Sequence, residues 1–494
     1  MRKSGILMPI ASLPGKYGIG TLGKEAYSFI DKLNEAGQSY WQILPIGPTG
    51  YGDSPYQSVS TFAGNPYFID LDMLVNDGLL TSKECDACDF GVDDKKIDYL
   101  KLYNKRFELL KKAYDRFIRE NKDDFASFCI KNDYWLADYA LYMAIKDSFG
   151  GKSFIEWDDD IRFRKSEAVK AYSEKYKYEI GYYKFIQYEF SVQWLKLKGY
   201  ANDKDVQIIG DIPFYVAFDS ADTWANPELF QFDNDGYPTA VAGCPPDGFS
   251  ADGQLWGNPL YDWAYHKKTG YEWWILRTGY CHELYDIIRV DHFRAFDEYY
   301  SIPYGNKDAR NGKWKKGPGI SLFKEMKAKL GKVEIIAEDL GFVTESVINL
   351  VKKTGFSGMK VIQFAFDSRE DSNYLPHNYS SNCVVYTGTH DNDTVVGWFK
   401  SMKKNDRQMA LDYINSKGLN TDEEISMAFI KLAMSSVAEL CIIPMQDYLS
   451  LDQSARINIP STLGNNWIWR MDHKAFNDKI VRKMRAVTEL YARI

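Results

Sequence analysis

The stretch "IIRVDHF", residues 287–293, places two charged side chains in an apolar run. Its aliphatic residues are typical of a buried β-strand, yet Arg289 and Asp291 lie within it. Burying a charge costs free energy unless the charge is paired or used. Because residues two apart on a strand share a face, Arg289 and Asp291 point the same way. The stretch therefore predicts a strand that holds a paired carboxylate near its carboxyl end.

Seven further runs share the short length and apolar, β-branched character of this one. Continuous apolar strands are typical of parallel sheets that are covered on both faces. Helical patterns lie between several runs, and the clearest, at 24–37, has its apolar residues at helical spacing. The eight predicted strands are 5–10, 40–46, 207–213, 287–293, 333–339, 359–366, 383–390 and 440–445. Eight strands alternating with helices predict an α/β protein with a (β/α)8 TIM barrel.

The gaps between the predicted strands are uneven, and the longest follow the second and third strands. We therefore expect a single catalytic barrel over 1–494 with two large insertions. One, at 80–200, is expected to be a mainly helical subdomain, and the other, at 217–285, to carry the active-site loop. Too few residues separate the sixth and seventh strands for a normal helix, which is a departure from a regular barrel.

Composition excludes several classes of protein. The chain of 494 residues has 61 basic and 68 acidic residues and a net charge of −7, which argues against a nucleic-acid partner. No apolar run approaches the roughly 18 residues of a membrane span. The seven dispersed cysteines fit reduced thiols and predict a cytoplasmic protein. Aromatic residues make up 15% of the chain, which fits either a large core or a surface that stacks sugar rings.

A glycine pattern near the N-terminus raises the alternative of a nucleotide-dependent enzyme. Gly18, Gly20 and Gly23 form G-x-G-x-x-G after the first strand, and Lys24 nearly completes a P-loop. A P-loop needs Ser or Thr after the lysine, and this chain has Glu25. A dinucleotide site needs an acid near the end of the second strand, which has none. The pattern is better interpreted as a loop at the barrel mouth.

Three other predicted strands also end in acids, namely Asp211, Glu338 and Asp391, the last preceded by His390. Each acid alone could be a helix cap or a solvated loop residue. Barrel active sites lie at the carboxyl ends of the strands, so these acids and Asp291 are expected to converge. Such a cluster suits glycosidic bond chemistry, in which one acid protonates the leaving oxygen while another attacks the anomeric carbon.

Two further features of the cluster are interpreted from the residues alone. Arg289 is expected to keep Asp291 ionised and oriented. Asp339 and Asp393, beside the cluster, are interpreted as caps or supporting groups. The chain has only six histidines and no H-E-x-x-H pattern, so we expect no metal site.

At this point the sequence resembles a known family. The motifs "IIRVDHFR", "AEDLG" and "GTHDNDT" resemble the catalytic strand ends of the α-amylase-related barrels. Longer stretches resemble the 4-α-glucanotransferases, also called amylomaltases or disproportionating enzymes, of glycoside hydrolase family 77. Those stretches are 44–71, 210–224, 245–261 and 458–470. The resemblance runs from the first strand to near the end of the chain, but 80–200 carries no motif of the family.

The resemblance implies roles for individual residues. Asp291 would be the nucleophile, Glu338 the general acid/base, and Asp391 a third carboxylate that binds sugar hydroxyls in the transition state. The substrate-binding residues that it implies are Tyr56, Asp211, Trp256, Arg289 and His390.

In four places the resemblance leaves a question open. The loop at 244–258 would overhang the cleft, but position 248 is glycine where some relatives carry an aromatic residue. Asn458, Trp467 and Trp469 match family positions, and their roles could be structural or functional.

The resemblance implies a 4-α-glucanotransferase that moves α-1,4-glucan segments between maltooligosaccharides by a retaining double displacement. The acceptor would be glucose or a maltooligosaccharide, and no cofactor is implied. An α-amylase-like hydrolase is the alternative, because it would use the same carboxylates with water as acceptor. A non-catalytic glucan-binding protein is less favoured, because binding alone does not need all three carboxylates.

Overall fold

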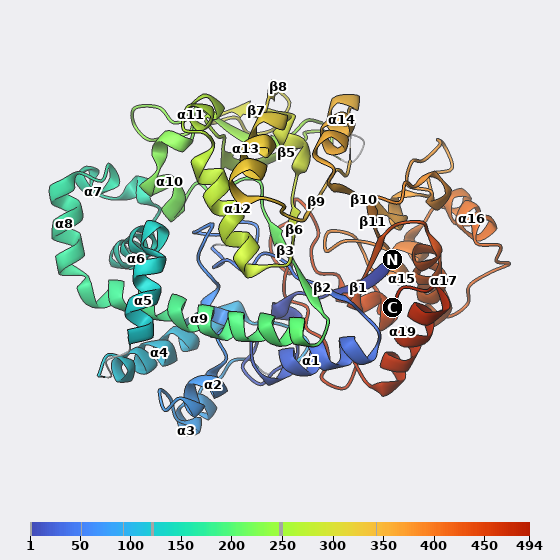
Figure 1. Ribbon diagram of the computed structural model, residues 1–494, viewed down its shortest axis with the longest axis horizontal. Helices are drawn as coiled ribbons and strands as arrows, with labels where there is room; N and C mark the ends of the chain where they lie inside the picture. The colour runs from blue at the N-terminus through green and yellow to red at the C-terminus, as the bar shows by residue number, and fades with distance from the viewer. Residues whose placement is uncertain (1, 51, 92, 120–122, 247–249, 342) are drawn as a thin grey trace.

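A computed structural model describes residues 2–50, 52–91, 93–119, 123–246, 250–341 and 343–494 (Figure 1). Its centre is a closed barrel of eight parallel strands, which confirms the predicted (β/α)8 fold. The strands follow one another around the barrel in chain order. They are β1 (Lys3–Leu7), β2 (Tyr40–Gln42), β3 (Gln207–Ile212), β6 (Ile287–Val290), β9 (Ile335–Ala337), β10 (Ser357–Val361), β11 (Cys383–Tyr386) and β12 (Leu440–Pro444).

Burial explains why the strands read as nearly continuous apolar runs. Every residue of β11 and β12 is buried, and in β3 only the first residue is exposed. Both faces of such a strand are covered, one by the barrel interior and the other by helices, so alternation with polar residues is lost.

Helices cover the outside of the barrel. They are α1 (Lys24–Glu35), α9 (Lys177–Asp203), α12 (Glu272–Leu284), α13 (Ile320–Leu330), α14 (Glu345–Thr354), α15 (Val395–Ser401), α16 (Lys404–Tyr413), α17 (Asp422–Ser435), α18 (Met445–Tyr448) and α19 (Asp478–Leu490). Between β10 and β11 there are only two short 3-10 turns, at Ile362–Phe364 and Pro376–Asn378. The expected departure from a regular barrel between the sixth and seventh strands is therefore confirmed.

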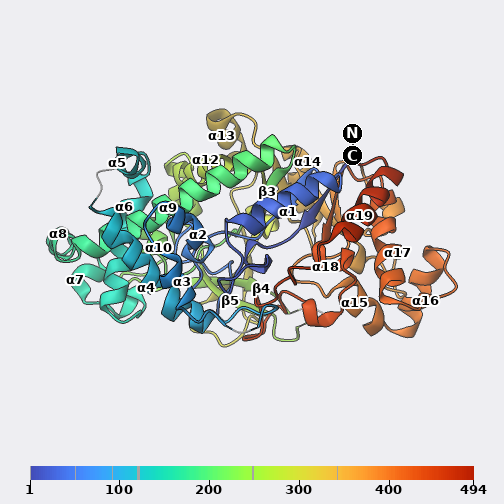
Figure 2. The same cartoon turned by 90° about the horizontal axis from the view of Figure 1, so that it is seen from below.

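Helices of very different lengths fill the long gap between β2 and β3 and lie to one side of the barrel, opposite α15–α17 (Figure 2). They are α2 (Leu71–Asn76), α3 (Ser82–Asp86), α4 (Tyr99–Phe117), α5 (Asp123–Lys131), α6 (Asp133–Ser148), α7 (Asp159–Arg162) and α8 (Ser166–Lys175). The long helix α9 packs on α6 at this side and also on β3 and α1 of the barrel. That 80–200 and 217–285 are separate insertions stays a prediction.

A second, antiparallel sheet was not expected from the sequence. Its strand order is β5 (Gln254–Pro259), β4 (Ala240–Cys244), β7 (Glu298–Pro303) and β8 (Lys313–Lys316). Two of its strands lie in 217–285, the stretch expected to carry the active-site loop, and the other two follow β6. In the chain, β6 lies between β4 and β7, so the pairing of β4 with β7 joins segments that are far apart in sequence. Short sequence patterns do not reveal such a pairing.

The glycine pattern near the N-terminus has a packing role. Gly23 caps the N-terminus of α1, and a β-carbon built there would lie 2.1 Å from the Asp70 carboxylate. Thr21 donates a hydrogen bond of 2.6 Å to the same carboxylate. The Asp70 carboxylate thus packs directly against the glycine at the start of α1, so this position has no room for a side chain.

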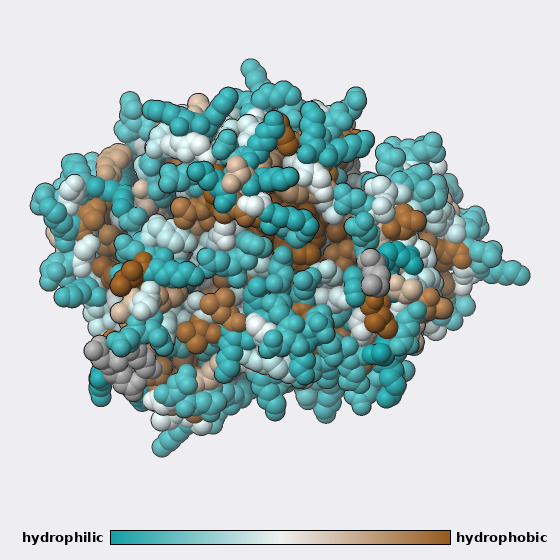
Figure 3. All heavy atoms as spheres, viewed as in Figure 1, coloured by the Kyte–Doolittle hydropathy of each residue, from teal (hydrophilic) through white to brown (hydrophobic). Residues whose placement is uncertain are grey.

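The surface seen in Figure 3 is mostly hydrophilic, with separate hydrophobic patches between the charged side chains. Within the described ranges, no helix combines the length and the apolar character needed to cross a bilayer.

Candidate active site

The core of the candidate site is an ion pair between two neighbouring barrel strands. Asp211 of β3 and Arg289 of β6 lie opposite each other in the parallel register. The Arg289 Nη1 atom donates to both Asp211 carboxylate oxygens, at 2.7 and 2.6 Å. Both side chains are almost completely buried. A charge-assisted pair in this setting fixes the guanidinium in one orientation.

Asp291 follows β6 directly and lies on the other side of the guanidinium. Its Oδ1 is 3.3 Å from Arg289 Nη2, and its backbone N–H donates to the Ile212 carbonyl. The Asp291 side chain is 32% exposed, whereas that of Asp211 is 0% exposed. Asp291 can therefore meet a bound molecule, while the main contacts of Asp211 are with the groups that it orients.

Glu338 follows β9, and two backbone N–H groups hold its carboxylate. His292 donates to Oε2 and Leu340 to Oε1, each at 2.8 Å. His292 adopts a left-handed conformation with φ of 50°, which residues with a side chain rarely take. The backbone that carries Asp291 thus bends sharply after β6, and the bent segment contacts Glu338.

Burial dominates the electrostatics of the two carboxyl groups. It raises the pKa of Asp291 well above the ordinary value, and Arg289 opposes this effect. Burial also raises the pKa of Glu338, against Arg289 and the two backbone N–H bonds. Arg289 thus favours the ionised form of Asp291, as expected, but burial has the larger effect on the pKa. Since like charges disfavour each other's ionisation, the pair retains a proton to higher pH than an isolated carboxyl would.

Tyr56 connects this cluster to the end of β11. Its hydroxyl donates a 2.7 Å hydrogen bond to Asp211 Oδ2, and its ring stacks on that of His390 with centroids 5.0 Å apart. Trp467 packs against both rings, at 5.9 Å from each. Burial lowers the pKa of His390, so the imidazole is neutral at neutral pH. Tyr56 and His390 therefore form one wall with Trp467 behind it.

Asp391 is held from the C-terminal part of the chain. Asn458 Nδ2 donates to Asp391 Oδ1 at 2.6 Å, and the Arg456 guanidinium donates to the Asp391 carbonyl at 2.6 Å. His390 Nε2 lies 3.5 Å from the same carboxylate oxygen. The resemblance leaves the role of Asn458 open between structural and functional, and Arg456 is not among the predicted site residues. Only the motif around 458 could have pointed to either.

The remaining predicted residues are also located. Trp256 lies on β5, and its ring meets that of His292 edge to face at 4.8 Å, close to the Glu338 contact. Trp469 is buried and makes a strand bridge with Lys96. Position 248 lies outside the described residues.

All eight predicted site residues belong to one connected network of contacts. It runs from Trp256 through His292 to Glu338, and from Asp291 through Arg289, Asp211 and Tyr56 to His390 and Asp391. The neighbouring acids instead make backbone contacts: Asp339 accepts from the Met359 N–H, and Asp393 from the Thr394 N–H.

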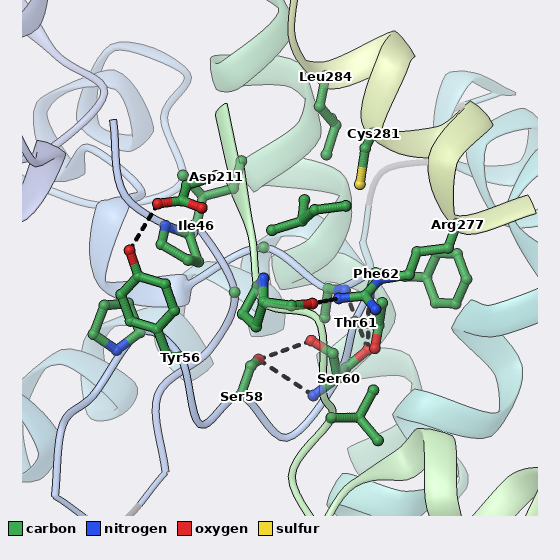
Figure 4. Close-up of a pocket in the computed structure, with 18 of the residues that line it drawn as sticks. Ile46, Tyr56, Ser58, Ser60, Thr61, Phe62, Asp211, Arg277, Cys281 and Leu284 are labelled. Carbon is green, nitrogen blue, oxygen red and sulfur yellow. Dashed lines mark hydrogen bonds between the residues drawn. The ribbon is translucent and has the colours of Figure 1, made fainter. Parts of the chain in front are cut away.

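A pocket opens beside the network (Figure 4). Tyr56 and Asp211 form one end of it, and Cys281 and Leu284 of α12 lie at the other. Asp291, Glu338 and Asp391 are not among its lining residues, so this pocket adjoins the carboxylates rather than containing them.

Known proteins resemble this chain over its whole length. The family described as 4-alpha-glucanotransferase matches residues 8–475. The 4-alpha-glucanotransferase of Clostridium butyricum is 50% identical over 488 residues, covering 98% of this chain and 100% of its own. That of Thermus thermophilus is 42% identical over 501 residues, covering 100% of this chain and 99% of its own.

Solved structures agree. An amylomaltase from Streptococcus agalactiae, determined in complex with acarbose, has a TM-score of 0.97 and 42% identity, with 100% of both chains covered. An amylomaltase from Corynebacterium glutamicum, 17% identical with a TM-score of 0.78 over 100% of this chain and 74% of its own, supports the fold alone. The chain thus belongs to the 4-alpha-glucanotransferase family, glycoside hydrolase family 77.

Proposed function

We propose that this protein transfers segments of α-1,4-glucan from one maltooligosaccharide to another by a retaining double displacement. The observation that carries the proposal is a set of contacts that joins Asp291 to Asp391 through Arg289, Asp211, Tyr56 and His390. The backbone N–H of His292, the residue after Asp291, holds Glu338 beside them. Membership of the 4-alpha-glucanotransferase family gives the reaction class.

In the first step, Asp291 attacks the anomeric carbon of the donor glucan. The bond from that carbon to the glycosidic oxygen breaks, and Glu338 gives its proton to the departing oxygen. The products are a covalent glucosyl–Asp291 ester, a shortened glucan that leaves, and an ionised Glu338. The two carboxyl groups disfavour each other's ionisation, which supports a pair in which one group holds a proton while the other is ionised.

In the second step, the 4-hydroxyl of an acceptor sugar replaces the shortened glucan. Glu338 takes the hydroxyl proton while the oxygen attacks the anomeric carbon and the ester bond to Asp291 breaks. Two inversions restore the α configuration. Both carboxyl groups return to their starting protonation states, so no cofactor is required.

The surrounding residues are proposed to bind the attacked glucose. Arg289, held by Asp211, would orient the nucleophile, and Tyr56 and His390 would form the wall beside the ring. Asp391, held by Asn458, would accept sugar hydroxyls in the transition state. Trp256 would supply an aromatic face for the glucan, because aromatic rings bury the apolar side of a sugar.

Hydrolysis by water is the competing outcome at the same carboxylates. Transfer prevails if the site excludes water and binds an acceptor through several sugar rings. Incubation with maltotriose alone should therefore release glucose and build longer maltooligosaccharides, with little change in total reducing ends. Chromatography of the products and a reducing-end assay measure both quantities.

The same experiment identifies a hydrolase. Transfer conserves the number of glycosidic bonds, whereas hydrolysis does not. If reducing ends rise in step with maltotriose consumption and no product longer than maltotriose forms, the proposed transfer is wrong.

The pH dependence should report on the carboxyl pair. Activity requires an ionised Asp291 and a protonated Glu338, so it falls as pH drops through the lower pKa of the pair and as pH rises through the upper one. Because burial raises both pKa values, the acidic limb should lie above the ordinary carboxyl range of about pH 4. The profile of kcat/KM for maltotriose checks this. An acidic limb below that range would contradict the raised values.

We also propose that the protein works in the cytoplasm without a metal. All seven cysteines are free thiols. In the part of the chain that the structure describes, no three His, Cys, Asp or Glu side chains are grouped to hold a metal ion.

A further inference from the structure

A second cavity lies between the helices beside the barrel and the barrel itself. Its lining residues come from α6, α10 (Ala221–Ala225), α11 (Trp263–Lys268), α12 and the loop before α2, and the helices can be followed in Figure 1. The space between its walls, including the open mouth, is about 860 Å³, against about 580 Å³ for the pocket beside Tyr56. Ser60 and Phe62 line both, so one loop borders the two spaces.

Aromatic rings form the wall of this cavity. Trp135 stacks on Phe62 at 6.1 Å, and Tyr134 and Trp273 meet Phe62 edge to face at 5.8 and 6.5 Å. The outer part of the wall is open to solvent: Tyr134 is 49% exposed and Leu276 37% exposed. Such a wall buries flat apolar surface, and the apolar face of a sugar ring is a surface of that kind.

The charge of the lining excludes one class of ligand. Among the described residues that line the cavity there is no lysine, arginine or histidine, and there are four acids, Asp138, Asp222, Glu228 and Glu272. Two of them are already engaged. Asp138 pairs with Arg164 at 2.6 Å, and Asp222 accepts the Thr61 N–H at 2.7 Å. A phosphorylated or carboxylated molecule would be repelled here, so the lining favours a neutral ligand.

Other polar groups of the lining have no partner within the protein. In the described structure, the carboxylates of Glu228 and Glu272 and the hydroxyls of Tyr134 and Tyr265 make no hydrogen bond or ion pair with another side chain or with the backbone. Carboxylates accept hydrogen bonds and phenol hydroxyls donate them. An aromatic wall with acceptors and donors at its edge matches the apolar faces and the hydroxyl rim of a neutral sugar.

We propose that this cavity is a second glucan-binding site, which holds part of a long α-1,4-glucan away from the catalytic carboxylates. The inference rests on the proposed function, because it takes the ligand to be the glucan that the enzyme rearranges. A glucan long enough to occupy both sites binds more tightly than either site alone would hold it, whereas a short donor reaches only the catalytic site. The cavity should therefore strengthen binding of long glucans and leave maltotriose unaffected.

The test measures amylose binding by native gel electrophoresis through amylose, in an Asp291→Asn background that leaves the polymer uncut. Tyr134→Ala removes the exposed ring of the wall, and Leu276→Arg places a long cationic side chain at the mouth. Tyr134→Ala should raise the apparent Kd for amylose by about 3- to 10-fold, the loss expected for one aromatic contact. Leu276→Arg should raise it by at least as much, because its side chain obstructs the mouth. In the otherwise wild-type enzyme, KM and kcat for maltotriose should stay within about twofold, because a short donor does not reach the cavity.

Tyr304→Ala is the matched control. Tyr304 is 48% exposed, follows β7 and does not line the cavity, so its loss should leave the amylose Kd unchanged. Thermal melting of each variant checks folding. Leu276→Arg removes no buried ring. If Tyr134→Ala lowers the melting temperature, the amylose Kd of Leu276→Arg therefore tests the proposal.

The two proposals fail in different ways. If both cavity variants are retained by amylose as strongly as Tyr304→Ala, the second site does not exist. If the wild-type enzyme fails to disproportionate maltotriose, the proposed function is wrong, and amylose retention still decides whether the cavity binds glucan.

Discussion

Asp291→Asn is expected to lower the rate of maltotriose disproportionation by about 10⁴-fold or more, because a carboxamide is a far poorer nucleophile than a carboxylate. The substitution keeps the size and shape of the side chain. The Arg289 guanidinium keeps its two bonds to Asp211, so the pocket should stay ordered. Initial rates of glucose release from maltotriose measure the loss.

The fold should survive this change. The surrounding protein partly removes water from Asp291 and disfavours its charge, so a neutral amide at the same place should not lower the melting temperature. Asp393→Asn is the matched control, because it makes the same chemical change in an acid beside the cluster. The Asp393 carboxylate contacts the Thr394 backbone N–H rather than the proposed catalytic groups. Near-normal turnover by Asp291→Asn, with an unchanged circular dichroism spectrum, would mean that Asp291 is not the nucleophile.

Glu338→Gln is expected to lower the glycosylation rate most for donors whose leaving group must be protonated to depart. The glycosylation rate with maltotriose should fall by about 10²- to 10⁴-fold, the usual contribution of a general acid. Fluoride departs with little protonation, so glycosylation by α-glucosyl fluoride should be far less affected. Rapid-quench measurement of fluoride release, compared with glucose release from maltotriose, gives the two rates.

A second readout tests the return step. Without a base to deprotonate the acceptor, the glucosyl–Asp291 ester should persist in Glu338→Gln, and mass spectrometry of the intact protein should detect one added glucosyl unit. Equal losses for the two donors in the glycosylation step would show that Glu338 is not the acid. Glu338 accepts two backbone N–H bonds, and Gln offers one oxygen, so melting temperatures must accompany the rates.

The barrel and the catalytic acids could be predicted from local sequence. Each barrel strand is a short apolar run, because burial on both faces demands it. The two-residue period of a strand placed Arg289 and Asp291 on one face, and the rule that barrel sites lie at strand carboxyl ends gathered Asp211, Glu338 and Asp391 at one mouth. These inferences need only neighbours in the chain and the symmetry of the fold.

The small sheet could be predicted much less well. The four-stranded sheet pairs Val241 with Ile302 across an entire barrel strand, and β8 is the charged run Lys313–Lys316. Neither feature has a local pattern that distinguishes it from an ordered loop. Strand pairing of this kind depends on which segments the barrel brings together, not on the residues of either segment.

The sequence alone determined the barrel, the strand ends that carry the acids and, through its motifs, the family. Tertiary structure alone decided the supporting contacts. Asn458 and Arg456 hold Asp391 although 67 and 65 residues separate them from it. It also decided that the left-handed His292 backbone meets Glu338, and that burial outweighs Arg289 in setting the Asp291 pKa. The physical reason is that periodicity acts between neighbours in the chain, whereas burial and hydrogen-bond partners are set by distances in space that only the folded chain fixes.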